Sequence, residues 1–190
     1  MSLPSDTTDD AEWDRYHKLI WRCELSALYH DKRERFLDGW DRFAKLVSFM
    51  GGAAAFMFIQ QSAPASGAGS ALNFAAISAV VISFTSGLSL VYQFSTKARK
   101  HAELSRDFKK LLGAIERHDP DALNAAVLGE WRFQISALEA SEPARLGALT
   151  THCHNELVVA RGNKELVTRL SWIQGLLMNY LDFDQSKLAD

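Results

Sequence analysis

The residue types best suited to chemistry stand side by side as His152, Cys153 and His154. Imidazole and thiolate groups are the ligands that Zn²⁺ prefers in proteins. On a helix, however, adjacent residues project about 100° apart, and helical zinc sites use ligands three or four positions apart. Cys153 also belongs to an apolar helical stripe with Leu149 and Leu157. We therefore expect a buried thiol between two polar residues, with a metal or redox site as the alternative.

No other group of residues forms a recognisable catalytic centre. Glu142, His154 and Glu156 do not assemble into an acid–base set, and no combination of Ser, His and Asp has supporting context. No glycine-rich loop follows an expected strand, so the usual nucleotide cradle is not predicted. The sequence thus predicts a protein that has no enzymatic activity and needs no cofactor.

The composition argues against a nucleic-acid partner, a disulfide-bonded fold and a cleaved signal peptide. A formal net charge of −2 over 190 residues does not suggest a nucleic-acid-binding protein. Cys23 and Cys153 are too few and too far apart for a disulfide framework, and they suit a reducing compartment. Residues 1–10 are polar and acidic, and they lack the basic and apolar regions of a cleaved signal peptide.

The middle of the chain carries no charge, because no Asp, Glu, Lys or Arg occurs between Lys45 and Lys97. Proline, glycine and serine gather at 62–71, which is a composition typical of a loop. On either side, residues 44–61 and 72–94 approach the roughly 20 apolar residues that cross a bilayer as a helix. The sequence thus predicts a two-helix transmembrane hairpin, and the alternative is a hairpin buried in a soluble core.

Basic residues on both outer sides of these spans predict an orientation. They are frequent in residues 32–45 and 97–110, whereas the loop between the spans contains none. By the positive-inside rule, both termini face the cytoplasm and the loop faces outward. We therefore expect a two-span, multi-pass protein of a bacterial-type inner membrane, in contact with the lipid bilayer.

The flanking regions complete an all-α fold. Residues 1–11 are expected to form a flexible tail, and residues 12–116 a hairpin whose long helices extend into the cytoplasm. Residues 117–190 are expected to form a C-terminal cytoplasmic helical bundle. We expect the helices to pack on one another or on further copies of the chain.

Start and stop signals divide this C-terminal region into three helices. Asp119 followed by proline predicts a helix that runs to about Ala140. A similar signal at Ser141 predicts the next helix, which Gly162 ends. Asn163 can then cap a last helix over 164–181, whose wide apolar face suits packing on the first two helices or contact with a membrane surface.

Two stripes along the uncharged segments indicate contacts. Small residues, which let helices approach closely in lipid, recur at four-residue steps and predict hairpin packing, an oligomer interface, or both. These residues are Ser48, Gly52, Ala75, Ala79, Ser83 and Gly87. A weakly polar stripe either lines a pore or bonds to the preceding helical turn, and the second alternative is the commoner one. Its members are Ser78, Thr85, Ser89 and Gln93.

The layout resembles the SLATT family of two-transmembrane effector domains, which accompany bacterial nucleotide-signalling defence systems. The resemblance is carried by Tyr16-His-Lys-Leu and Lys32-Arg-Glu-Arg before the first span, and by Ser95-Thr-Lys-Ala-Arg-Lys100 after the second. It covers about residues 12–116. It implies two spans, cytoplasmic helices and a pore-forming or membrane-disrupting role gated by a partner, although this chain carries no nucleotide-sensing domain of its own.

Taken together, these features predict an oligomeric membrane effector, gated by a cytoplasmic protein partner or signal. The alternative is a membrane-anchored scaffold whose cytoplasmic helices bind a partner. A sensor that uses Cys153 with His152 or His154 is a third hypothesis.

Overall fold

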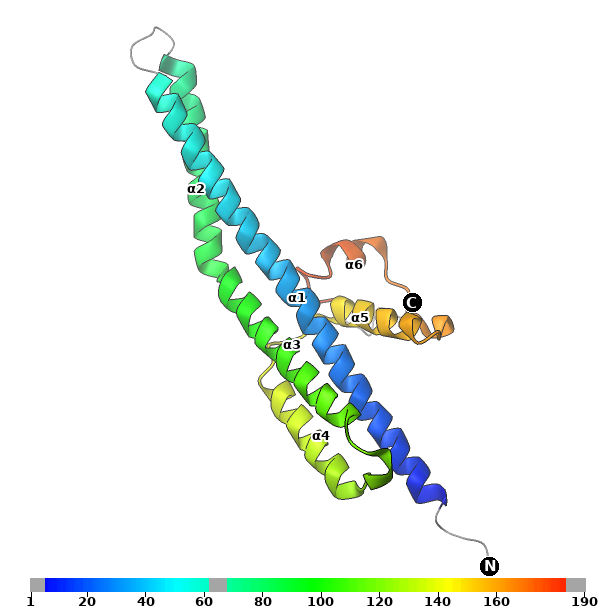
Figure 1. Ribbon diagram of the computed structural model, residues 1–190. Helices are drawn as coiled ribbons and strands as arrows, with labels where there is room; N and C mark the ends of the chain where they lie inside the picture. The colour runs from blue at the N-terminus through cyan, green and yellow to red at the C-terminus, as the bar shows by residue number, and fades with distance from the viewer. Residues whose placement is uncertain (1–5, 62–67, 184–190) are drawn as a thin grey trace, which may run out of the picture. The chain divides into compact units, whose positions relative to one another are not determined.

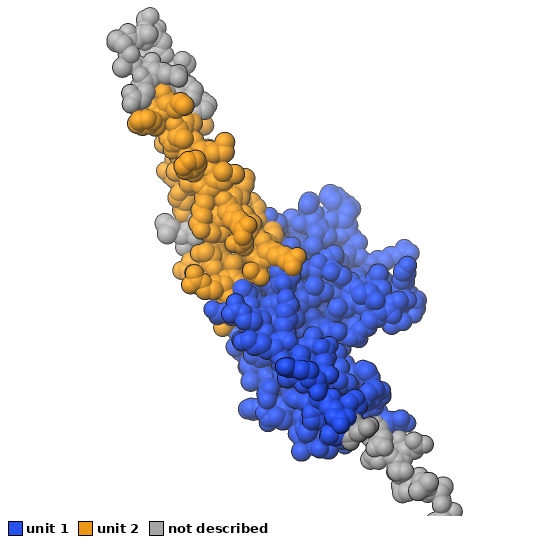
Figure 2. Space-filling view, viewed as in Figure 1, with its two compact units in different colours: residues 1–33, 101–190 blue, residues 34–100 orange. Residues whose placement is uncertain are grey.

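The computed structural model describes residues 6–61 and 68–183, and every regular element in these ranges is a helix (Figure 1). The expectation of an all-α fold is thus confirmed for the described residues. The chain divides into two compact units (Figure 2). Unit 1 combines residues 1–33 with 101–190, and unit 2 contains residues 34–100.

Three long helices precede a series of shorter ones. They are α1 (Asp6–Gln61), α2 (Ala68–Tyr92) and α3 (Phe94–Glu116). The shorter α-helices are α4 (Ala125–Ala140), α5 (Gly147–Ala160) and α6 (Trp172–Leu177). Two 3₁₀ turns, η1 (Pro120–Ala122) and η2 (Lys164–Leu166), lie before α4 and after α5.

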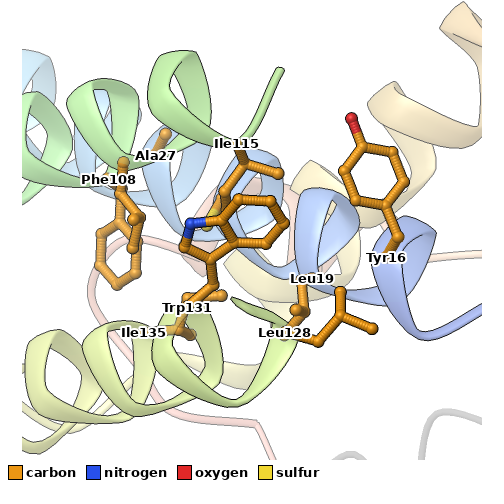
Figure 3. Close-up of a cluster of buried hydrophobic side chains, with 10 residues drawn as sticks. Tyr16, Leu19, Ala27, Phe108, Ile115, Leu128, Trp131 and Ile135 are labelled. Carbon is orange, nitrogen blue, oxygen red and sulfur yellow. The ribbon is translucent and has the colours of Figure 1, made fainter. Parts of the chain in front are cut away.

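The core of unit 1 forms where α1, α3 and α4 pack together (Figure 3). Each helix contributes apolar residues at three- or four-residue steps, which places them on one face. The buried members are Tyr16, Leu19, Cys23 and Ala27 from α1, Phe108, Leu111 and Ile115 from α3, and Leu128, Trp131 and Ile135 from α4. A bidentate pair from Arg22 to Glu139 also joins α1 to α4, with Nη2 and Oε2 2.5 Å apart.

A second buried cluster holds α5 against a different face of α1. Tyr29 of α1 packs there with Leu149 and Cys153 of α5. Two ion pairs reinforce the contact: Lys32 with Glu156 at 2.7 Å, and Arg161 with Glu24. Unit 1 therefore uses residues 6–33 of α1 as a shared support for helices on more than one side.

The C-terminal helices differ from expectation at their starts. The first begins later than Asp119, because the Asn124 side chain accepts hydrogen bonds from the backbone N–H groups of Ala126 and Val127 and so caps α4. Its end at Ala140 agrees with the prediction. Gly162, with φ 82°, follows the end of α5 as expected, since a positive φ favours glycine.

The predicted helix over 164–181 is wrong, because only η2 and the short α6 form there. The Asn155 side chain bonds to both the N–H and the C=O of Thr168, which holds this backbone outside a helix. Ser171 then starts α6 through a capping box with Gln174. Side-chain partners thus override the helical pattern of the segment.

Unit 2 contains the last part of α1, all of α2 and the start of α3. The α2 residue Ile82 approaches Gly51 of α1 closely, because a Cβ placed on Gly51 would be 2.8 Å from the Ile82 side chain. The expected continuous helix from the second uncharged segment breaks at Gln93, whose φ is 47°. Helix α3 therefore begins afresh at Phe94, whose ring stacks on Trp40.

The predicted membrane spans, 44–61 and 72–94, are not supported. Among the described residues, none of the helices combines the length and the apolar character that a bilayer crossing requires. The uncharged end of α1 stops at Gln60 and Gln61, and hydroxyl side chains recur along α2. This finding contradicts the expected localisation in an inner membrane with two spans and two cytoplasmic termini. The central part of the expected loop, residues 62–67, lies outside the described residues.

Candidate functional site

The structure separates the three adjacent residues that are ligand types. Cys153 is fully buried, as its apolar stripe predicts, and burial raises the pKa of its thiol to about 12. His152 lies 3.9 Å from Glu156, whereas the His154 ring meets the edge of Trp21. In the ranges that the structure describes, no three His, Cys, Asp or Glu residues are placed to hold a metal ion.

The predicted small-residue stripe lies mostly on the outside of unit 2. Gly52, Ala79, Ser83 and Gly87 are exposed, and a Cβ on either glycine would meet nothing within 4 Å. Ser48 is half-buried, whereas the Ala75 side chain lies outside the described residues. These exposed positions are free for contacts beyond the α1–α2 pair, while Gly51 provides the close approach within it.

The predicted polar stripe makes local contacts where it is described. The Thr85 hydroxyl donates to the carbonyl oxygens of Val81 at 2.9 Å and Ile82 at 3.1 Å, which is bonding to the preceding turn. Ser78 is half-buried, and the Ser89 side chain lies outside the described residues. Gln93 is exposed at the break between α2 and α3.

Large apolar side chains are exposed along unit 2, and we call this set the apolar surface of unit 2. Phe49 is 75% exposed, Phe84 67% and Val91 78%. Its described members are Phe43, Leu46, Phe49, Met50, Phe56, Met57, Ile77, Val80, Val81, Phe84, Val91 and Tyr92. A concentration of exposed large apolar side chains is a feature that interaction sites share.

A second candidate site is buried inside unit 1, and we call it the histidine cluster. It contains His30 of α1, His101 of α3, and Glu142 and Arg145 from the linker between α4 and α5. His30 is fully buried, His101 is 5% exposed, and the Glu142 side chain is also 5% exposed. Buried charged and polar groups are expensive unless they pair, so these contacts fix where three elements meet.

The two histidine rings are joined directly. Their Nδ1 atoms are 2.8 Å apart, so one nitrogen donates a proton and the other accepts it. On its other side, His30 Nε2 lies 3.2 Å from Glu142 Oε1, an ion-pair distance with an angle too poor for a hydrogen bond. We assign the His30 proton to Nε2, facing the carboxylate, which leaves His30 Nδ1 to accept from His101.

Arg145 completes the cluster by binding both Glu142 oxygens, at 2.6 and 2.8 Å. It also donates to the Ser26 hydroxyl at 2.6 Å, while the next residue, Leu146, donates its N–H to the Tyr29 hydroxyl at 3.0 Å. Burial raises the pKa of Glu142, but the adjacent His30 ring and the hydrogen bonds from Arg145 outweigh it and hold that pKa below its ordinary value. The carboxylate is therefore charged at neutral pH.

The environment of His101 favours the neutral ring. Burial, followed by the nearby charges of His30 and Arg33, lowers the pKa of His101 to about 4. A buried imidazole held this way can take up a proton only when the pH falls or the packing opens. The arrangement can thus respond to acid, and it places no nucleophile beside a base.

Sequence reasoning missed this cluster, because its histidines are 71 residues apart and belong to different helices. His101 stands out only as a histidine on the apolar stripe of α3, and Glu142 only as part of a helix-start signal. A histidine on the apolar face of two neighbouring helices is the one signal that could have suggested a buried pair.

No family model, curated protein or solved structure matches this chain. The resemblance to the SLATT family is therefore neither supported nor excluded, and the function must be argued from the site alone.

Proposed function

We propose that this chain is a self-assembling helical protein without enzymatic activity, and that the apolar surface of unit 2 binds a second copy of the same chain. The observation that carries the proposal is the exposure of large apolar side chains on helices that carry no charge between Lys45 and Lys97. Unit 1 then serves as the folded support that presents this surface.

The size of the hydrophobic effect favours an assembly. Burying one large apolar side chain fully is worth about 1.5–3 kcal/mol, and association costs roughly 4–15 kcal/mol in lost freedom. A few side chains such as Phe49, Phe84 and Val91 can therefore offset that cost when they become buried together.

A second copy suits this surface better than a charged partner does. Charged groups placed against residues 46–96 would lose water without gaining an opposite charge. An identical uncharged face brings no such penalty, and a twofold contact buries the same patch on both copies. The exposed small residues Gly52, Ala79, Ser83 and Gly87 also allow two helices to approach closely.

Sedimentation velocity of the full, tag-free chain without detergent tests the proposal. We expect the wild type to sediment as a dimer or larger species, and a Phe49→Glu, Phe84→Glu double variant to sediment as a folded monomer. Phe133→Glu is the matched control. The Phe133 side chain is 69% exposed, a fraction similar to the 67% of Phe84, but it lies on α4 in unit 1. The control should keep the wild-type mass.

Three results would contradict the proposal. A wild-type monomer at micromolar concentration would remove the second copy. Recovery of the wild type only with sedimented membranes would show that lipid covers the surface instead. Equal loss of assembly in Phe133→Glu and in the double variant would move the contact away from unit 2.

A further inference from the structure

The His30–His101 pair joins α1 to α3 inside unit 1, and its geometry limits how many protons the two rings can carry. With the Nδ1 atoms 2.8 Å apart, a single proton lies between the rings. A first additional proton makes one ring cationic, and at His30 this charge faces the Glu142 carboxylate 3.2 Å away. A second additional proton must place two cationic rings against each other.

We propose that the pair is an acid-sensitive latch: uptake of a second additional proton forces the two rings apart and loosens the packing of α3 on α1 in unit 1. At neutral pH the shared hydrogen bond holds the two helices together, beside the bond from the Ser105 hydroxyl to the Ala27 carbonyl at 3.1 Å. The latch is independent of whether unit 2 assembles.

The groups that face the pair explain why the packed rings do not bind a second additional proton. From α1, the Tyr29 ring packs at a steep angle to both histidine rings, and Arg33 adds positive charge near His101. The linker contributes one carboxylate, Glu142, and Arg145 already occupies both of its oxygens. The single negative charge of Glu142 is already balanced by Arg145, so it cannot also balance two cationic rings.

An apolar aromatic side chain packs against another side of the pair. The Phe108 ring of α3 stacks on His30 with centroids 5.9 Å apart, and Phe108 is fully buried. A second positive charge cannot be solvated while α1 and α3 stay packed, so it is accommodated by opening. The stability of the contact between α1 and α3 therefore depends on pH through the two histidines.

The expected effect follows from the change in proton affinity on unfolding. For His101 the pKa is 6.5 as an ordinary histidine and about 4 in the folded chain. Lowering the pH from 7.5 to 5 then raises the equilibrium constant for unfolding about 30-fold through this one residue. Stability is fully present above pH 6.5 and falls as the pH drops toward 4.

The experiment is chemical unfolding of the full chain at several pH values between 7.5 and 5, for wild type, His101→Gln and His17→Gln. His17 is an exposed histidine of α1 and provides the matched control. Between pH 7.5 and 5, the equilibrium constant for unfolding should rise about 30-fold less in His101→Gln than in the wild type. In His17→Gln it should rise by as much as in the wild type. Amide exchange in residues 101–108, corrected for intrinsic rates, should rise at pH 5 in the wild type.

A second measurement decides the matter if His101→Gln does not fold. Nitrogen-15 imidazole NMR of the wild type should show His101 still neutral at pH 5.5. A cationic His101 in folded protein at that pH would overturn the latch, and so would an unchanged pH dependence in His101→Gln. Unchanged amide exchange of α3 at pH 5 would also overturn it.

Discussion

Unit 1 and unit 2 are both built from helices, yet they differ in which side chains they bury and which they leave exposed. Unit 1 buries aromatic residues such as Phe108 and also places a histidine beside a carboxylate in its interior, at His30 and Glu142. Unit 2 leaves Phe49 and Phe84 exposed on helices without charge. Unit 1 thus completes a buried core within one chain, although Phe133 and Trp172 on its surface are exposed, whereas the exposed apolar residues of unit 2 lie on helices without charge, which is the basis of the proposed contact with a second copy.

The two units also differ in what fixes their helices. In unit 1, ion pairs and hydrogen bonds connect α1 to α4, to α5 and to the linker. In unit 2, the described contacts between α1 and α2 include the close approach of the Ile82 side chain to Gly51. Polar contacts thus help to hold the helices of unit 1 together, whereas the contact described between α1 and α2 in unit 2 is apolar.

The largest difference is expected for the removal of a phenyl ring. Phe108→Ala leaves a cavity in the unit 1 core and should lower the free energy of unfolding by about 3–5 kcal/mol. Phe84→Ala removes an exposed ring and should change it by less than about 0.5 kcal/mol under conditions where the chain is monomeric. Denaturant unfolding measures both, and equal losses would abolish the distinction between the units.

Thiol reactivity sharpens the description of the unit 1 interior. Cys23 and Cys153 are both fully buried, and burial raises the pKa of each thiol from 9.0 to about 12. At pH 8 the thiolate fraction should be about 1,000-fold lower than in the unfolded chain. Alkylation followed by mass spectrometry should therefore be very slow until denaturant is added, and fast labelling of folded protein would contradict the packing.

Removal of the buried carboxylate tests the polar part of unit 1. Glu142→Gln leaves Arg145 without its charge partner and should cost about 2–3 kcal/mol, less than a fully buried pair because the Arg145 side chain is 28% exposed. Because the pKa of Glu142 lies below 4.5 in the fold, its contribution is present above pH 4.5 and disappears as the pH falls through that lowered pKa. The variant should lack this acid loss, as urea unfolding at pH 7 and pH 3.5 would show.

The smallest effect comes from two adjacent glycines of unit 2. Alanine favours a helix over glycine by about 1 kcal/mol. Under conditions where the chain is monomeric, Gly52→Ala meets nothing within 4 Å and should gain that amount, whereas Gly51→Ala places a Cβ 2.8 Å from Ile82 and should gain about 1 kcal/mol less. Thermal unfolding of both variants checks the order, and equal stabilisation would show that α1 and α2 do not approach closely there.

Sequence patterns predicted the features that depend on neighbours along the chain. The helical character, the burial of Cys153 and the glycine stop at Gly162 all follow from local periodicity or backbone preference. The helix expected over 164–181 failed because Asn155 and Thr168 bond across the intervening turn. That contact is tertiary and leaves no periodic trace.

The expected membrane spans and the missed histidine cluster failed for different reasons. The absence of charge between Lys45 and Lys97 identifies an uncharged stretch, but such a stretch need not be long and apolar enough to cross a bilayer, and none of the described helices is. His30 and His101 meet only because α1 and α3 pack in unit 1. That contact is a property of the fold and does not follow from the order of residues along the chain.

Cross-linking between copies tests the assembly most directly. A Ser83→Cys chain places a thiol on the exposed face of α2, and a Phe133→Cys chain places one on α4 of unit 1. With a short bismaleimide and no detergent, Ser83→Cys should give a covalent dimer, while Phe133→Cys and the parent chain should form no covalent dimer. No dimer from Ser83→Cys, or equal dimer from Phe133→Cys, would contradict the claim that unit 2 binds a second copy.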